Sequence, residues 1–323
     1  MAGGQERTLR RRIKSVQSTK KITKAMELIA ASRIVKAQQR VAAARPYSER
    51  ITEVIRNLAG AGAGGGSPLL AERESVSTIA YVVVAADRGL CGAYNSSVIR
   101  QAEREMLAQR AAGVETRLVT VGKKALSYFR FRGWAIDESF QGFADQPAYE
   151  DARRVAELVV GRFEAGEYDK VQLVYTQFLS AATQRVVTRQ FVPLDSSMLE
   201  QAADSGPSAD YEFEPGPEQI LDRLLPRYAE ARLYAAFLDG AASFLAAQQR
   251  AMKSATDNAE ELITKYTRAM NRVRQDAITT EIMEIVGGAE ALRAAQSGRG
   301  DLLVDHALMS ADILHNQLEH ARR

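Results

Sequence analysis

Cysteine and histidine are scarce in this sequence, and their scarcity excludes several kinds of catalytic site. The 323 residues include one cysteine, Cys91, which has no partner within the chain for a disulfide. The three histidines, His306, His315 and His320, all lie in the last 18 residues. Neither Ser-His-Asp nor Cys-His catalysis is therefore available in the body of the chain, and zinc-finger spacing is absent. We expect no catalytic residue, no metal site and no cofactor.

Long apolar runs are also missing. The longest uninterrupted run covers the eight residues 79–86, whereas a membrane-spanning helix needs roughly 20. Four arginines near the start, Arg7, Arg10, Arg11 and Arg12, are not followed by an apolar stretch, so the pattern of a secretory signal is absent. Together with the single thiol, these absences predict a chain of a reducing cytosol that does not insert into a membrane.

Proline and glycine are unevenly distributed, and the gaps between them predict two long helices. Between positions 5 and 59 there is one proline, Pro46, and no glycine. Between positions 227 and 286 there is no proline, and the only glycine is Gly240. A glycine cluster ahead of Pro68 predicts a flexible break after the first helix. The expected parts are an N-terminal helix over 1–59, a connector over 60–78 and a C-terminal helix over 217–292.

Both expected helices carry a coiled-coil pattern, in which mainly apolar residues alternate by three and four positions. The pattern predicts a helix pair that extends beyond a compact domain, because the C-terminal seam is sustained for more than seven heptads. Near the N-terminus two apolar sets are out of phase, which predicts a local stutter. These sets are Leu9, Ile13 and Val16, and Ile22, Met26 and Ile29. The expected seam positions are 34, 37, 41, 44, 48, 51, 55 and 58 on the first helix, and 221, 224, 228, 231, 235, 238, 242, 245, 249, 252, 256, 259, 263, 266, 270 and 273 on the second.

Between the helices the pattern changes to alternating strands and helices. Short β-branched apolar runs predict buried parallel strands at 79–86 and 170–176, with 116–122 and 186–192 as their partners. This alternation predicts a small Rossmann-like α/β domain over 79–194, followed by a polar loop over 195–216. The fold class is therefore α/β plus coiled coil, with the sheet domain inserted between the two long helices. The expected helices of the domain cover 94–113, 123–132 and 149–165.

The charge is concentrated at one end. Residues 1–40 hold eleven Lys and Arg against two acids, Glu6 and Glu27, which gives that segment a net charge of +9. The rest of the chain must carry −6, since the total is +3. A basic segment of this kind is typical of a chain that binds an anionic partner, either a nucleic acid or an acidic protein surface.

The first expected strand ends in a glycine-bearing turn at 87–95, which opens a helix. A phosphate could bind at such a helix start, and a small-molecule enzyme would hold its ligand at Gly89 and Gly92. The dinucleotide fingerprint and the Walker pattern are both missing, however, because the turn has two glycines and Lys124 stands where Ser or Thr is needed. We expect a tight structural turn, with Cys91 as a structural thiol, since no histidine is available to activate it.

The segment 278–291, ITTEIMEIVGGAEA, fits a specific signature: I-T-x-E, an acid three positions on, and then G-A. With three further blocks, it resembles the gamma subunit of F-type, proton-translocating ATP synthases of bacteria, in particular those of actinobacteria. The other three are 13–27, 87–95 and 251–259, and the segment 271–275 is also similar. The blocks occur in the family's order and cover nearly all of residues 1–292.

This resemblance implies a central rotor shaft that is not itself the catalyst. The terminal helices would form an antiparallel coiled coil inside a ring of three alpha and three beta subunits. The α/β domain would bind the epsilon subunit and the membrane c-ring, with one copy of this chain per complex at the cytoplasmic face of the cell membrane. The implied ring contacts are Lys24, Met26, Arg274, Gln275, Thr279 and Glu281; the implied contacts to epsilon and the c-ring are Tyr211, Glu212, Phe213 and Glu214.

Some positions depart from the family. Phe244 stands where the family usually has an acid, Ala86 replaces a small hydroxyl residue, and 31 residues follow Leu292. Within this extension, 293–323, the residues at 297–300 predict a helix break, with Asp301 as the cap of a new amphipathic segment. We expect the extension to be helical or disordered. The alternative function is a basic coiled-coil protein that binds nucleic acid.

Overall fold

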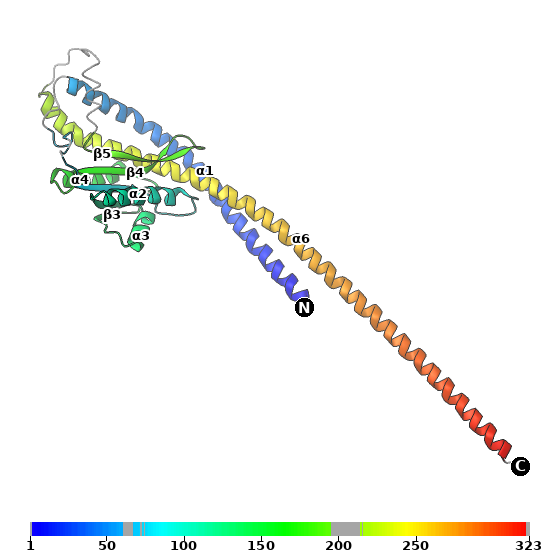
Figure 1. The fold of residues 1–323 in the computed structure, drawn as a ribbon. Helices are drawn as coiled ribbons and strands as arrows, with labels where there is room; N and C mark the ends of the chain where they lie inside the picture. The colour runs from blue at the N-terminus through cyan, green and yellow to red at the C-terminus, as the bar shows by residue number, and fades with distance from the viewer. Residues whose placement is uncertain are drawn as a thin grey trace. The chain divides into compact units, whose positions relative to one another are not determined.

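A computed structural model describes residues 2–60, 67–71, 73, 75–194, 214 and 216–320 (Figure 1). The chain divides into two compact units, Lys21–Thr256 and the pair of segments Met1–Lys20 and Asp257–Arg323. The helices are α1 (Ala2–Gly60), α2 (Tyr94–Ala111), α3 (Lys123–Phe131), α4 (Tyr149–Glu164) and α6 (Pro217–His320). The strands are β1 (Thr78–Val84), β2 (Glu115–Val121), β3 (Glu138–Phe140), β4 (Lys170–Phe178) and β5 (Gln184–Val192).

The five strands form one mixed sheet in the order β3-β2-β1-β4-β5. The first four are parallel, with Val82 of β1 level with Val119 of β2 and Leu173 of β4. The expected strands and the α/β class are confirmed. β5 runs antiparallel to β4, because the short connection between them can close a hairpin but is too short for a parallel crossover. The three-residue strand β3 was not expected.

Each face of the sheet has its own core, and the alternation of side chains along β1 separates the two. Ile79, Tyr81 and Val83 pack with residues of α2 and α3 on one face. Ala80 and Val82 pack on the other face, in a core shared with α4 and with parts of α1 and α6. A strand buried on both faces in this way reads as a continuous apolar run, which is why the sequence predicts β1 so clearly.

Within the unit Lys21–Thr256, α1 and α6 pack side by side and antiparallel (Figure 1). Ile55 shares a core with Leu225, whereas Ile34, earlier on α1, packs with Leu245, later on α6. Thr23 and Thr256 lie close, with 2.8 Å between their hydroxyl oxygens. All eight expected seam positions on α1 from 34 to 58 are buried or half-buried, so this part of the predicted seam is confirmed.

The predicted stutter is wrong, because the heptad spacing continues through the first half of α1 on smaller and more polar residues. Ile22 and Ile29, which the sequence analysis placed on the seam, are 62% and 52% exposed. Thr23 and Ala30 are buried instead, and the Thr23 hydroxyl is satisfied by Thr256. In this part of α1, small size and hydrogen bonding, rather than apolar character, determine which residues pack against α6. The half-buried and buried positions of the seam here are Glu6, Leu9, Ile13, Val16, Lys20, Thr23, Glu27 and Ala30.

The helix break expected at 297–300 is also wrong, since α6 continues through these positions to His320. Two glycines inside a helix weaken it by about 1 kcal/mol each, and good helix formers on both sides offset that loss. α6 likewise includes Pro226, and α1 includes Pro46.

Candidate partner-binding surfaces

The turn after β1 is held by the chain's own side chains. One oxygen of Asp87 accepts a hydrogen bond from the backbone N–H of Lys123, the first residue of α3, at 3.0 Å. The other oxygen accepts from the N–H groups of Gly142 at 3.0 Å and Ala144 at 3.1 Å. Asp87 therefore ties the turn to the start of α3, where a carboxylate carries the charge that the helix dipole favours. This geometry supports the structural interpretation of the turn.

Residues at the end of the turn connect the sheet to α6. The Tyr94 hydroxyl donates to the carbonyl of Gly240 at 2.9 Å, and burial raises the Tyr94 pKa, which keeps the hydroxyl protonated. A Cβ at position 240 would lie 3.4 Å from that hydroxyl oxygen, an ordinary van der Waals contact, so the approach does not by itself require glycine. Phe244 meets the Tyr94 ring edge-on at 5.8 Å between centroids, which gives the unusual Phe244 a packing role.

Cys91 lies in the same turn and is buried, with 2% of its surface exposed. Asn95 donates to its sulfur at 3.2 Å and to the Arg88 carbonyl at 3.0 Å. Burial raises the pKa of the Cys91 thiol, so the reactive thiolate is disfavoured. These contacts fit the structural thiol that the sequence analysis expected.

Most of the implied contact residues that the structure describes are exposed, and most of them lie on α1 or α6. Lys24 is exposed, with its ammonium nitrogen 3.1 Å from a carboxylate oxygen of Glu27, and Met26 is half-buried beside it on α1. Of the implied contacts to epsilon and the c-ring, Glu214 is exposed, whereas positions 211–213 lie outside the described residues. The assigned roles remain predictions. The implied contacts on α6, all exposed, are Arg274, Gln275, Thr279 and Glu281.

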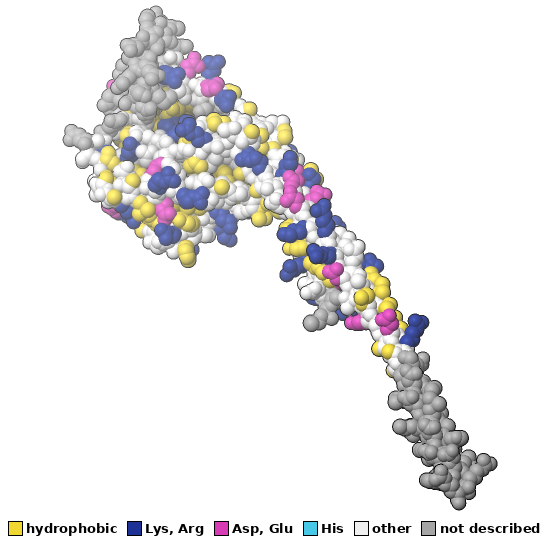
Figure 2. All heavy atoms as spheres, turned by 45° about the vertical axis from the view of Figure 1, so that its right-hand side comes forward, with side chains coloured by type: hydrophobic (Ala, Val, Ile, Leu, Met, Phe, Trp, Pro, Cys, Tyr) yellow, Lys and Arg dark blue, Asp and Glu magenta, His cyan; other side chains and the backbone are white. Residues whose placement is uncertain are grey.

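Two exposed apolar surfaces were missed by the sequence analysis. We call the first the α1 outer surface; it comprises Ile22, Leu28, Ile29 and Val35, which are between 52% and 62% exposed. The second, the α6 distal surface, comprises Ile278, Ile282, Met283, Ile285, Val286 and Leu292, which are between 45% and 72% exposed. Figure 2 shows hydrophobic side chains among Lys and Arg along the helices. Exposed apolar patches bordered by charge are typical of protein–protein interfaces.

The α6 distal surface has a helical repeat that the sequence does carry. Positions 278, 282, 285, 289 and 292 alternate by four and three, which places them on one face of α6. Every described side chain from 278 to 295 is exposed. Among the described residues, then, the chain supplies nothing that buries this stripe.

The electrostatics of α1 also favour a partner. The basic residues Arg7, Arg11, Arg12 and Lys14 are exposed, and Arg10, also exposed, forms an ion pair with Glu6 at 2.8 Å.

Among the described residues, no helix could cross a membrane, and no cluster of three or more His, Cys, Asp or Glu could hold a metal ion.

Comparison with known proteins gives the family. A family profile described as ATP synthase matches residues 5–292. The sequence is 53% identical to the ATP synthase gamma chain of Frankia casuarinae over 293 residues, which is 90% of this chain and 98% of the relative. The chain belongs to the ATP synthase gamma chain family. The gamma chain of Mycolicibacterium smegmatis is 48% identical, over 90% of this chain and 98% of the relative. The gamma chain of Streptomyces coelicolor is 47% identical, over 92% of this chain and 99% of the relative.

Solved structures share the fold of this chain. One similar chain comes from the OSCP/F1/c-ring structure of Euglena gracilis mitochondrial ATP synthase, with a TM-score of 0.64 and 18% sequence identity. The superposition covers 91% of this chain and 96% of the Euglena chain. A chain of the central stalk and c-ring structure of Tetrahymena thermophila mitochondrial ATP synthase gives a TM-score of 0.56 at 24% sequence identity. It covers 72% of this chain and 99% of the Tetrahymena chain. The family predicted from the four sequence blocks is confirmed, and with it the function of an ATP synthase gamma chain, a non-catalytic subunit.

Proposed function

We propose that this chain is the rotating central shaft of an F-type ATP synthase, which couples proton flow through a membrane ring to ATP synthesis at a separate catalytic head. The observation that carries the proposal is the α6 distal surface, whose apolar side chains lie in no core of the described chain. A partner that surrounds this part of α6 would bury them. The Tetrahymena relative is described as part of a central stalk with its c-ring, which supports the same role.

The coupling follows from a mismatch of symmetry. A shaft of two unlike helices presents a different face to each site of a threefold head. Only the difference in contact free energy between the open and closed states of a site shifts its population. Each partial turn of the shaft therefore changes which site of the head is stabilised in its closed state. The catalytic groups belong to the beta subunits.

The proposed partners are three alpha and three beta subunits around the helices, and the epsilon subunit and the c-ring at the α/β domain. One copy of this chain would serve each complex, at the cytoplasmic face of the bacterial membrane. Lys24 and Met26 would face an acidic loop of the head, and the basic α1 keeps such contacts favourable as the shaft moves past. Glu214 and residues 211–213 would contact epsilon and the c-ring.

The test is the substitution Ile285→Asp in the α6 distal surface. Ile285 is 72% exposed, so the charge should not disturb the chain's own fold. Inside an apolar sleeve it would be an unpaired buried charge, and we expect at least about a tenfold loss of head subunits that copurify with the chain. Leu107→Asp on α2, at a position 51% exposed, is the matched control and should copurify normally. Normal copurification and normal ATP turnover of the Ile285→Asp complex would contradict the proposal.

A further inference from the structure

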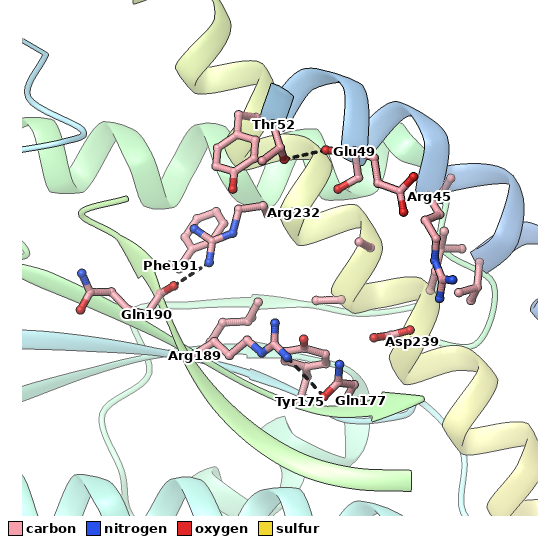
Figure 3. A pocket seen from close by; sticks show the side chains of 18 of the residues that line it. Arg45, Glu49, Thr52, Tyr175, Gln177, Arg189, Gln190, Phe191, Arg232 and Asp239 are labelled. Atoms are coloured by element: carbon pink, nitrogen blue, oxygen red, sulfur yellow. Dashed lines mark hydrogen bonds between the residues drawn. The ribbon is translucent and has the colours of Figure 1, made fainter. Parts of the chain in front are cut away.

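A cavity of about 520 Å³ lies inside the unit Lys21–Thr256, between α1, the β4–β5 hairpin and α6 (Figure 3). Its volume falls in the range of small-molecule sites. Three aromatic rings, those of Tyr175, Phe191 and Tyr228, contribute to its wall. None of the residues used in the proposed rotor contacts lines it, so it requires a separate explanation.

The cavity is lined by more positive than negative charge. Arg45 and Arg56 come from α1, Arg189 from β5 and Arg232 from α6, against the acids Glu49 and Asp239. Within the described part of the chain, no carboxylate oxygen lies within 4.0 Å of a guanidinium nitrogen of these four arginines. Arg189 donates only a long hydrogen bond, 3.3 Å, to Gln177. The lining therefore has an excess of about two positive charges.

One nitrogen of Arg232 shows that this charge is not fully satisfied. Its Nη2 donates to the Gln190 carbonyl at 2.9 Å, whereas its Nη1 is buried and has no hydrogen-bond partner. The guanidinium carbon lies 5.6 Å from the centre of the Tyr228 ring, which holds the group against the wall. A buried donor without an acceptor is unfavourable, and a ligand oxygen at this position would remove the penalty.

One of the two acids, Asp239, is a weak counter-ion. Asp239 is half-buried, and desolvation of its carboxylate raises its pKa to about 6, although Arg189 and Arg45 act in the opposite direction. Its carboxylate accepts a hydrogen bond from the backbone of Phe178, which positions it at one side of the cavity. Figure 3 shows Asp239 between the side chains of Arg45 and Arg189. Arg45 and Arg189 therefore share a carboxylate that is itself poorly solvated.

We propose that this cavity binds a phosphate group, either as inorganic phosphate or as the phosphate end of a nucleotide-sized metabolite. Guanidinium groups contributed by three different elements can donate to a tetrahedral anion from several directions, whereas a carboxylate offers two oxygens in one plane. Arg45 and Arg189 lie at the exposed mouth, and Arg232 lies deeper. The aromatic wall would accommodate the base of a nucleotide.

Calorimetric titration of the purified full-length chain with inorganic phosphate and with ADP, in separate experiments, tests this proposal. Arg189→Gln should weaken binding by about tenfold or more, because a charged hydrogen-bond donor is lost. Asp239→Asn keeps an oxygen for Phe178 but removes a competing charge, so it should tighten binding several-fold. The matched control is Arg153→Gln, an exposed α4 arginine paired with Glu157, which should bind as the wild type does.

The outcomes separate the two sources of the phosphate group. Binding of both probes with similar affinity supports free phosphate, and binding of ADP alone supports a nucleotide. The proposal is overturned if neither probe gives saturable binding, if citrate binds more tightly than both, or if Arg153→Gln weakens binding as much as Arg189→Gln. Thermal melts confirm that each variant is folded, and the gain expected from Asp239→Asn cannot arise from misfolding.

Discussion

The helix α6 places the same kinds of side chain in two opposite environments. Between positions 221 and 245 most of its leucines and both phenylalanines are buried against the sheet and α1; Leu225 and Leu233 are completely inaccessible. Between 278 and 292 its isoleucines are exposed, as at Ile285. The first region stabilises this chain's own fold, and the second is available to another protein. Apolar periodicity alone does not distinguish the two, because both keep a helical repeat.

The largest expected difference between the two regions is in stability. Leu233→Ala should lower the free energy of unfolding by about 2–5 kcal/mol, because it opens a cavity in a closed core. Ile285→Ala should change it by less than about 0.5 kcal/mol, since no packing is lost within the chain. Denaturant unfolding of both variants measures this. Equal losses would mean that the distal region is also part of this chain's core.

A second prediction concerns the junction of the buried region with the turn. Tyr94→Phe removes the hydrogen bond to the Gly240 carbonyl and leaves a buried acceptor unpaired. We expect a loss of about 1–2 kcal/mol in the same unfolding measurement. Tyr47→Phe, at a site 52% exposed, is the control and should be neutral. A neutral Tyr94→Phe would show that the contact does not fix α6 to the sheet.

In the exposed region the expected effect is on turnover rather than on stability. Replacement of both Arg274 and Gln275 by Ala should leave the helix intact, because alanine is the best helix former. We expect ATP hydrolysis by the assembled complex to fall by about threefold, equivalent to roughly 0.7 kcal/mol of barrier. Arg153→Ala serves as the control. Wild-type turnover with wild-type assembly would remove these two residues from the proposed head contacts.

Met26 tests the boundary between the two environments, because it is half-buried on α1. Met26→Lys adds a charge two positions from Lys24 and should form a new, state-dependent pair with an acidic loop of the head. We expect proton pumping per ATP hydrolysed to decrease more than assembly does, with Met26→Leu close to the wild type. Unchanged pumping at matched hydrolysis rates would argue against a contact at this position.

The sequence predicts the fold well where apolar residues fill the buried positions, and less well where small or polar residues fill them. β1 follows from a continuous apolar run and the seam from 34 to 58 follows from apolar periodicity, because other parts of the chain cover both. The first half of α1 was misjudged, since Thr23 and Ala30 fill the seam while Ile22 and Ile29 face outward. β3 is too short to carry a period.

The candidate sites show the same limit. The resemblance to the gamma subunit supplied the implied contact residues, whereas periodicity alone does not distinguish the α6 distal surface from a buried seam. The arginine-lined cavity could not be predicted, because its residues are far apart in the sequence and are brought together by packing of α1 and α6 on the sheet.

The most direct test of the central claim is to observe rotation. Phe131 is 88% exposed at the end of α3, whereas the only natural thiol, Cys91, is buried. Phe131→Cys therefore allows a bead to be attached to the α/β domain of a surface-fixed head complex. The account predicts rotation in one direction while ATP is hydrolysed, with three pauses per turn. Continued hydrolysis with a stationary bead on intact complexes would contradict it.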